Sequence, residues 1–165
     1  MNFDLREATP GDIPDVLRLV RGLARYEKLE HEAVATEADF HAALFGAQPR
    51  GYAVLACVSG RPPVGLALWY YTFSTFTGRA DMFLEDLFVE PAFRGGGIGL
   101  GLLRHLARRA VAEKCRRIEW RVLNWNQPSI DFYARLGATP LQDWHVRQLG
   151  GAALAALAQG ESNHG

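Results

Sequence analysis

A glycine-rich segment near the middle of the chain has the residue types and spacing of an anion-binding loop. The apolar run Leu87-Phe88-Val89 is followed by Glu90-Pro91, by Arg94-Gly95-Gly96-Gly97, and then by residues with helical spacing. A strand that passes through a glycine loop into a helix leaves several backbone N–H groups without partners, with the positive end of the helix dipole behind them. Glycine suits such a loop because a Cβ atom would hold a phosphate away from the backbone. We therefore expect a pyrophosphate site; a glycine-rich turn without a ligand is the alternative.

The spacing of these glycines excludes two common nucleotide-binding loops. A P-loop, G-x-x-x-x-G-K-[ST], is absent because no Lys-Ser or Lys-Thr pair follows the glycines. The dinucleotide pattern G-x-G-x-x-G fails because Leu102 stands where the third glycine is required. What remains is R-x-x-G-x-G, formed by Arg94, Gly97 and Gly99, directly after a predicted strand.

The elements that must position this loop form one α/β domain over residues 1–165, a length typical of one domain of roughly 100–200 residues. Alternating and continuous apolar runs predict strands at 3–7, 52–58, 64–73, 81–89, 117–123 and 144–149. Helical spacing predicts helices at 13–26, 36–46, 98–113, 126–137 and 151–159, with 161–165 frayed. The helix at 98–113 joins two strands that should therefore be parallel.

Two of these helices carry more detailed predictions. Thr36 and Asp39 resemble a capping box, which predicts a helix start there. The buried face of the helix at 98–113 is expected to consist of Ile98, Leu102, Leu103, Leu106, Ala107, Ala110 and Val111, whereas Arg104, Arg108, Arg109 and Glu113 should face away.

The composition excludes several classes of function. Lys+Arg and Asp+Glu are equal at 18 each, so no global field favours nucleic acid or a membrane surface. The N-terminus lacks the apolar core of a signal peptide, and no apolar run approaches the ~18 residues of a membrane span. Cys57 and Cys115 fit no metal or redox spacing, so we expect reduced thiols and no metal. These features together predict a cytoplasmic protein.

Several stretches agree with one known family. They are Ala24–Glu27, Leu68–Phe73, Leu84–Val89, Arg94–Gly99 and Trp125–Tyr133. The chain resembles the GNAT acetyltransferases, and within them the diamine (spermidine/spermine) and thialysine acetyltransferase branch. R-x-x-G-x-G alone indicates a GNAT enzyme, whereas LEDLFV together with WNxPSIxFY is typical of that branch. The resemblance covers roughly residues 3–150 and implies a mixed, mostly antiparallel central sheet with a parallel splayed strand pair, flanked by helices.

The resemblance implies an N-acetyltransferase that passes the acetyl group of acetyl-CoA directly to an amine in a ternary complex. An alkylammonium with a pKa near 10.4 cannot attack until it loses a proton. At the family's base position stands Glu85, acting directly or through ordered water. Tyr133 occupies the family's general-acid position. A phenol can serve as this acid because it is still protonated at neutral pH and can donate to the departing thiolate.

The same resemblance implies two sets of binding residues. Acetyl-CoA would be held by Leu87, Phe88, Val89, Arg94, Gly95, Gly96, Gly97, Ile98, Gly99, Leu100, Asn126 and Ser129. The acceptor amine would be held by Tyr26, Glu27, Glu85, Asp86, Glu119, Trp120 and Arg121, with the aromatic run Trp69-Tyr70-Tyr71 nearby, because a cationic amine requires carboxylates and aromatic faces. The acidic residues Glu30 and Glu32 either add charge or are simply solvated.

Two departures from the branch bear on the acceptor. Lys28 places a positive charge beside Glu27, and the region before Trp144 is shortened to Gln142-Asp143. Both weaken the case for spermidine and leave room for a thialysine-like amino acid. A protein lysine or N-terminal acetyltransferase is an alternative, as is a non-catalytic CoA-binding module, which predicts loss of Glu85 and Tyr133. The resemblance also implies a homodimer.

Overall fold

The computed structural model describes residues 2–160, which divide into two compact units. The first unit runs to Leu123 and contains the sheet and three helices, and the second begins at Asn124 and contains two helices. The predicted fraying of residues 161–165 lies outside the described residues.

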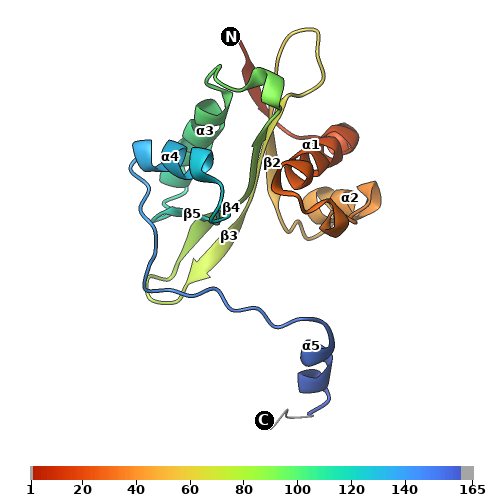
Figure 1. Ribbon diagram of the computed structural model, residues 1–165, viewed down its shortest axis with the longest axis vertical. Helices are drawn as coiled ribbons and strands as arrows, with labels where there is room; N and C mark the ends of the chain where they lie inside the picture. Colours follow the sequence, from red (N-terminus) through yellow and green to blue (C-terminus); the bar gives the residue numbers. More distant parts are fainter. Residues whose placement is uncertain (1, 161–165) are drawn as a thin grey trace. The chain divides into compact units, whose positions relative to one another are not determined.

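The first unit is built on a mixed sheet with the strand order β1-β2-β3-β4-β5 (Figure 1). Its strands are β1 (Asp4–Glu7), β2 (Tyr52–Cys57), β3 (Gly65–Ser74), β4 (Arg79–Val89) and β5 (Ile118–Trp120). Successive strands pair antiparallel from β1 to β4, and β4 pairs parallel with β5. The predicted parallel pair is therefore confirmed, although β5 is shorter than the 117–123 expected from the sequence.

Helices cover both faces of this sheet. The helices α1 (Ile13–Glu27) and α2 (Glu37–Phe45) lie on one face, and α3 (Ile98–Ala112) lies on the other (Figure 1). Short 3-10 turns occur at Pro10–Asp12, Glu30–Glu32 and Pro91–Phe93. The capping box at the start of α2 is confirmed: the backbone N–H of Asp39 donates to Thr36 Oγ1, and the Asp39 carboxylate accepts from the Thr36 backbone N–H at 2.8 Å.

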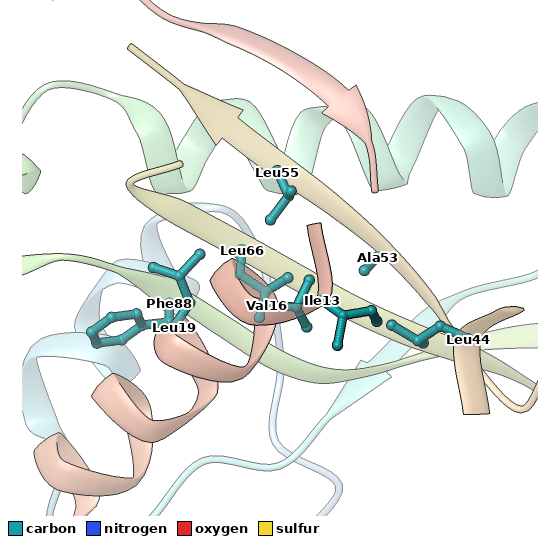
Figure 2. Close-up of a cluster of buried hydrophobic side chains, with 8 residues drawn as sticks. All are labelled: Ile13, Val16, Leu19, Leu44, Ala53, Leu55, Leu66 and Phe88. Atoms are coloured by element: carbon teal, nitrogen blue, oxygen red, sulfur yellow. The ribbon is translucent and has the colours of Figure 1, made fainter. Parts of the chain in front are cut away.

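The core on the α1 face joins two helices to three strands. Figure 2 shows how Ile13, Val16 and Leu19 of α1 project toward the sheet. The full cluster consists of Ile13, Val16, Leu19, Leu44, Ala53, Leu55, Leu66 and Phe88. Burial of large aliphatic and aromatic side chains contributes about 1.5–3 kcal/mol each, so this layer fixes the position of α1 against β4.

The buried face of α3 differs from the prediction at three positions. Ile98, Leu102, Leu103, Leu106 and Ala110 are buried as expected. Ala107 and Val111 are exposed, the latter by 77%. Arg109, expected to face away, instead lies over the Trp69 ring at 5.2 Å and forms an ion pair with Glu7 at 2.8 Å. Its aliphatic stem covers an aromatic surface while its charge reaches a carboxylate, so an arginine takes the place expected of an apolar residue.

The second unit contains α4 (Gln127–Arg135) and α5 (Gly151–Ala158). The side chain of Asn126 caps α4 by accepting from the Ser129 backbone N–H at 3.4 Å, and Gly137 takes the left-handed conformation (φ 85°) that ends it, as predicted. The predicted last strand at 144–149 is wrong, since the segment has no strand pairing in the described chain and Trp144 is 77% exposed. Alternating residues alone do not make a strand, because a strand also requires a partner for its backbone groups.

Replacement of Gly22 by alanine is expected to destabilise the protein. An added Cβ atom would lie 2.8 Å from Cε1 of Phe88, a buried ring that cannot move without disturbing the core. Overpacking costs about 1–3 kcal/mol, and loss of a helical glycine regains at most about 1 kcal/mol. We expect the free energy of unfolding in urea to fall by about 1 kcal/mol. The Gly22→Ala/Phe88→Leu double variant should lose less stability than the sum of the losses in the two single variants. If Gly22→Ala instead raises the free energy of unfolding, the Phe88 ring does not restrict this position.

Candidate active site

A β-bulge in β4 lies at Glu85, the predicted catalytic base. Leu68 of β3 pairs with Asp86, and the next residue, Trp69, pairs with Leu84, so Glu85 has no partner in β3. Bulges of this kind redirect side chains and occur often beside active sites. Because Phe83 pairs with Tyr70 and Asp86 with Leu68, the extra residue brings Phe83 and Asp86 to the same face of the sheet.

The same face carries three carboxylates whose charges interact. The pKa of Asp86 is raised to about 7, first by burial and then by the negative charges of Glu85 and Glu27. Burial also raises the pKa of Glu27. The three carboxylates repel one another, and this repulsion helps to hold Asp86 near its neutral form. A bound cation would offset the repulsion. This acidic face, defined by Glu27, Glu85 and Asp86, therefore fits an ammonium group.

Replacement of Asp86 by asparagine is expected to stabilise the free protein at neutral and higher pH. The pKa of this carboxyl group is raised from 3.8 to about 7 in the fold, so ionisation opposes folding as pH rises from about 4 to about 7. The variant should match the wild type below pH 4 and exceed it above pH 7 by roughly 2–4 kcal/mol in urea unfolding. A variant that is less stable than wild type above pH 7 would contradict this assignment.

Asp81 provides the matched control for Asp86. Burial alone would raise the pKa of Asp81, but hydrogen bonds from Arg116 and the charges of Arg116 and Arg117 outweigh burial and lower it. Asp81→Asn should therefore destabilise the protein at neutral pH, opposite in sign to Asp86→Asn.

The aromatic residues divide between the two faces of the sheet. Tyr70 stacks on Phe83 with ring centroids 5.2 Å apart, on the face of Asp86. Trp69 and Tyr71 point to the other face, where Tyr71 hydrogen-bonds Glu113, the C-cap of α3. Only the middle residue of the run Trp69-Tyr70-Tyr71 therefore joins the acidic face. Phe83 is not among the residues predicted from the sequence, although strand alternation could have identified it as the residue two positions before Glu85.

The predicted acceptor residues at 119–121 are also divided between the two faces of the sheet. Glu119 pairs with Phe83 across the parallel ladder and binds Arg117 at 3.0 Å. Arg121, two residues further on, places its guanidinium 5.3 Å from the Phe83 ring centroid. Trp120 pairs with Leu84 and so belongs to the opposite face.

The edge of β4 beyond the bulge has a strand partner on one side only. β5 pairs with Met82–Leu84 and goes no further, whereas β3 pairs with β4 as far as Val89. In the described chain, the backbone of residues 85–89 is therefore unpaired by any strand on the β5 side. An extended chain with amide groups, such as a pantetheine arm, can add there as a strand does.

The glycine loop has the geometry expected of an anion site. Gly95 and Gly97 adopt left-handed φ angles of 78° and 85°, and Gly97 is the N-cap of α3. No described backbone carbonyl accepts from the N–H groups of residues 95–100. A Cβ atom at Gly95 or Gly97 would meet nothing within 4 Å, so the space beside both glycines is open. The residues present therefore fit a pyrophosphate group.

Arg94 is held by contacts within the first unit. Its guanidinium lies 4.6 Å from the ring centroid of Tyr26 and 5.7 Å from that of Phe88. Its Nε donates a hydrogen bond to the Val89 carbonyl at 2.9 Å. Tyr26 is therefore brought beside the glycine loop, and the phosphate contact of Arg94 stays a prediction.

The remaining predicted residues belong to the second unit. Tyr133 is half-buried in α4, and its ring centroid lies 5.3 Å from that of Phe132. Asn126 is buried at the start of this helix, where it bonds Ser129 as described above.

Other features do not extend the site. A hollow of about 440 Å³ is lined by the N-terminal ends of α1 and α2 and includes none of the predicted site residues. Within residues 2–160, no three or more His, Cys, Asp or Glu side chains are placed to hold a metal ion. The helices in this part of the chain lack the length and apolar character needed to span a bilayer.

Solved structures share the fold defined by this sheet. An integron cassette protein from the mobile metagenome of V.cholerae aligns with a TM-score of 0.81 and 26% identity, over 96% of this chain and 99% of that one. A putative acetyltransferase from Agrobacterium tumefaciens str. C58 aligns with a TM-score of 0.71 and 26% identity, over 88% and 99% of the two chains. This fold and the glycine loop before α3 together indicate an acetyltransferase.

The chain belongs to the acetyltransferase (GNAT) family, whose model matches residues 16–138, and it is an N-acetyltransferase. That match continues across the boundary between the two units at 123/124. Enzymes of this family use acetyl-CoA.

Curated relatives are similar over most of the chain. The thialysine N-epsilon-acetyltransferase of Sus scrofa is 37% identical over 93% of this chain and 96% of its own. The spermidine/spermine N(1)-acetyltransferase-like protein 1 of Homo sapiens is 36% identical over 87% of this chain, which corresponds to 22% of that longer protein. The L-ornithine N5-acetyltransferase NATA1 of Arabidopsis thaliana is 26% identical over 93% of this chain.

Proposed function

We propose that the protein transfers the acetyl group of acetyl-CoA directly to a primary amine of a small cationic molecule. The observation that carries this proposal is the β4 bulge, which gathers Glu85 and Asp86 where β4 loses its β5 partner. An ammonium site is thus formed beside a backbone edge that suits an extended amide-containing arm. The names of the relatives support a small cationic acceptor: two are named as acetyltransferases of thialysine and L-ornithine, and a third is named as similar to a spermidine/spermine acetyltransferase.

Acetyl-CoA is the second substrate, and several groups of the chain hold it. The N–H groups of residues 95–100 bind the pyrophosphate, supported by the dipole of α3. Backbone groups of Leu87, Phe88 and Val89 bind the pantetheine arm and polarise the thioester carbonyl. Arg94 adds positive charge near the loop, and Asn126 and Ser129 supply the second contact with CoA.

The transfer step needs two proton acceptors, Glu85 and water, and one proton donor, Tyr133. The bound ammonium first loses a proton to Glu85, directly or through water, and becomes a nucleophilic amine. The nitrogen attacks the thioester carbon, a C–N bond forms, and the nitrogen loses a second proton to water. The C–S bond then breaks, and the departing thiolate takes a proton from Tyr133. The products are an N-acetylated amine and free CoA thiol.

The acceptor is held by charge and by aromatic faces. Glu27 and Asp86 bind the ammonium groups, and Tyr26, Tyr70 and Phe83 add aromatic faces. Glu119 and Arg121 border the acidic face along β5. This arrangement accommodates either a diamine or a thialysine-like amino acid.

The whole chain acts as one domain in this proposal, as the continuous family match supports. The subunit is further proposed to form a homodimer, which rests on the resemblance alone, and to act in the cytoplasm, which rests on the sequence features described above.

Product analysis tests the proposed function. The protein is incubated with acetyl-CoA and, separately, thialysine, lysine, spermidine, putrescine and a lysine-containing peptide, and the products are identified by mass spectrometry. Acetylation of a small amine in preference to the peptide supports the proposal. Acetylation of the peptide alone would indicate a protein acetyltransferase, and binding of acetyl-CoA without any acetylated product would indicate a non-catalytic module.

A further inference from the structure

Arg121 brings a positive charge to the face that carries the acidic residues. Its guanidinium lies over the ring of Phe83 at 5.3 Å, and Phe83 stacks on Tyr70 at 5.2 Å. Both rings share the face of Asp86, because Tyr70 pairs with Phe83 and Leu68 with Asp86 on adjacent strands. A cation is unexpected in a site for polyamines, whose charges are all positive.

The nearby arginines are neutralised, whereas Arg121 is not. Arg116 and Arg117 pair with Asp81, and Arg117 also pairs with Glu119. Within residues 2–160, no carboxylate forms an ion pair with Arg121. Its planar guanidinium is held on an aromatic face and keeps its donors for another acceptor.

Tyr70 senses both signs of charge. Burial raises the pKa of its phenol, the charge of Glu85 raises it further, and the charge of Arg121 lowers it. The hydroxyl group therefore lies within the influence of a carboxylate and of a guanidinium. The face presents negative charge at Glu85 and Asp86 and positive charge at Arg121.

This pattern is complementary to one class of molecule. A linear diamine offers only ammonium groups, and its second end would meet Arg121 at an electrostatic cost. An amino acid with a side-chain amine offers an ammonium at one end and a carboxylate at the other. Guanidinium binds carboxylate through two parallel hydrogen bonds, which fixes orientation as well as charge.

We infer that Arg121 binds the α-carboxylate of a lysine-like amino acid whose side-chain amine faces Glu85 and Asp86. This inference rests on the proposed function and narrows its substrate class. Arg121 is then the residue that selects amino acids over diamines of the same length.

Lysine and cadaverine give the sharpest test, because they differ only in the carboxylate. The ratio of their kcat/KM values is measured with acetyl-CoA for the wild type, Arg121→Gln, Arg121→Glu and Arg108→Glu. Arg108 is the matched control, as an exposed arginine of α3 outside the acidic face. We expect the wild type to prefer lysine by about tenfold or more, the value of one good charge-assisted contact. Arg121→Gln should remove this preference, Arg121→Glu should reverse it, and Arg108→Glu should keep it.

The outcomes separate this inference from the proposal on which it rests. A wild type that acetylates small amines with a ratio unchanged in both Arg121 variants would overturn the carboxylate role of Arg121 and leave the proposed function standing. A wild-type preference for cadaverine would do the same. A wild type that acetylates thialysine, spermidine or putrescine but neither lysine nor cadaverine would overturn this inference alone. A wild type that acetylates none of these small amines would overturn the proposed function and this inference with it. Circular dichroism of each variant shows that it is folded, and Arg121→Gln preserves the test if Arg121→Glu does not fold.

Discussion

The Tyr133→Phe variant is expected to lose about 100-fold or more in kcat while it binds acetyl-CoA nearly as well as the wild type. The substitution removes only the phenolic oxygen, so the helix and the ring contact with Phe132 are retained. Without a proton donor, the thiolate must leave unprotonated, and the barrier rises only in the transition state. The measurement is free-thiol release at saturating substrates, with the dissociation constant of acetyl-CoA determined by calorimetry.

Two comparisons identify the role of this phenol. Tyr52→Phe removes a phenol from the face of the sheet opposite to Asp86 and should leave kcat unchanged. An acetyl thioester of an aromatic thiol, whose thiolate leaves readily, should be much less sensitive to Tyr133→Phe than acetyl-CoA is. An unchanged kcat in Tyr133→Phe would remove this residue from the mechanism.

The Glu85→Gln variant should lose about 100-fold in kcat/KM for the amine at neutral pH. Glutamine has nearly the same shape but cannot accept the proton of an ammonium group. Because the free amine becomes abundant only as pH approaches its pKa of about 10.4, the deficit should shrink steadily as pH is raised. The measurement is the ratio of wild-type to variant kcat/KM between pH 7 and pH 10.

A matched carboxylate separates the base from general charge. Glu37, an exposed residue in the first turn of α2, can be changed to glutamine without altering the acidic face, and this variant should retain wild-type rates at every pH. A Glu85→Gln deficit that stays constant across the pH range would indicate that Glu85 binds the cation and does not remove its proton.

Local patterns predicted those features of the fold that depend on neighbouring residues. The capping box of Thr36 and Asp39 and the glycine that ends α4 are both confirmed, because caps involve groups a few residues apart. The parallel pairing of β4 and β5 also followed from local order, since a crossover helix requires it. The strand expected at 144–149 failed because its pattern was local while strand formation depends on a distant partner.

The candidate site shows the same division. The sequence and its resemblance drew attention to Glu85, Asp86 and the glycine loop, but not to the bulge, which requires the register of β3 on β4. The register also decides that Tyr70 and Phe83 share the acidic face while Trp69 does not. The inward position of Arg109 was missed because helical periodicity assigns charged residues to solvent, whereas this one packs on Trp69.

Two-substrate initial-rate kinetics show whether the acetyl group passes directly from acetyl-CoA to a small cationic amine. Free-thiol release is measured while acetyl-CoA and the preferred small amine are both varied. For direct transfer we expect thiol release that depends on the amine, reciprocal plots that intersect, and no acetylated protein in intact mass spectra taken without amine. Parallel plots with an acetylated enzyme, or thiol release that needs a protein substrate and ignores small amines, would contradict it.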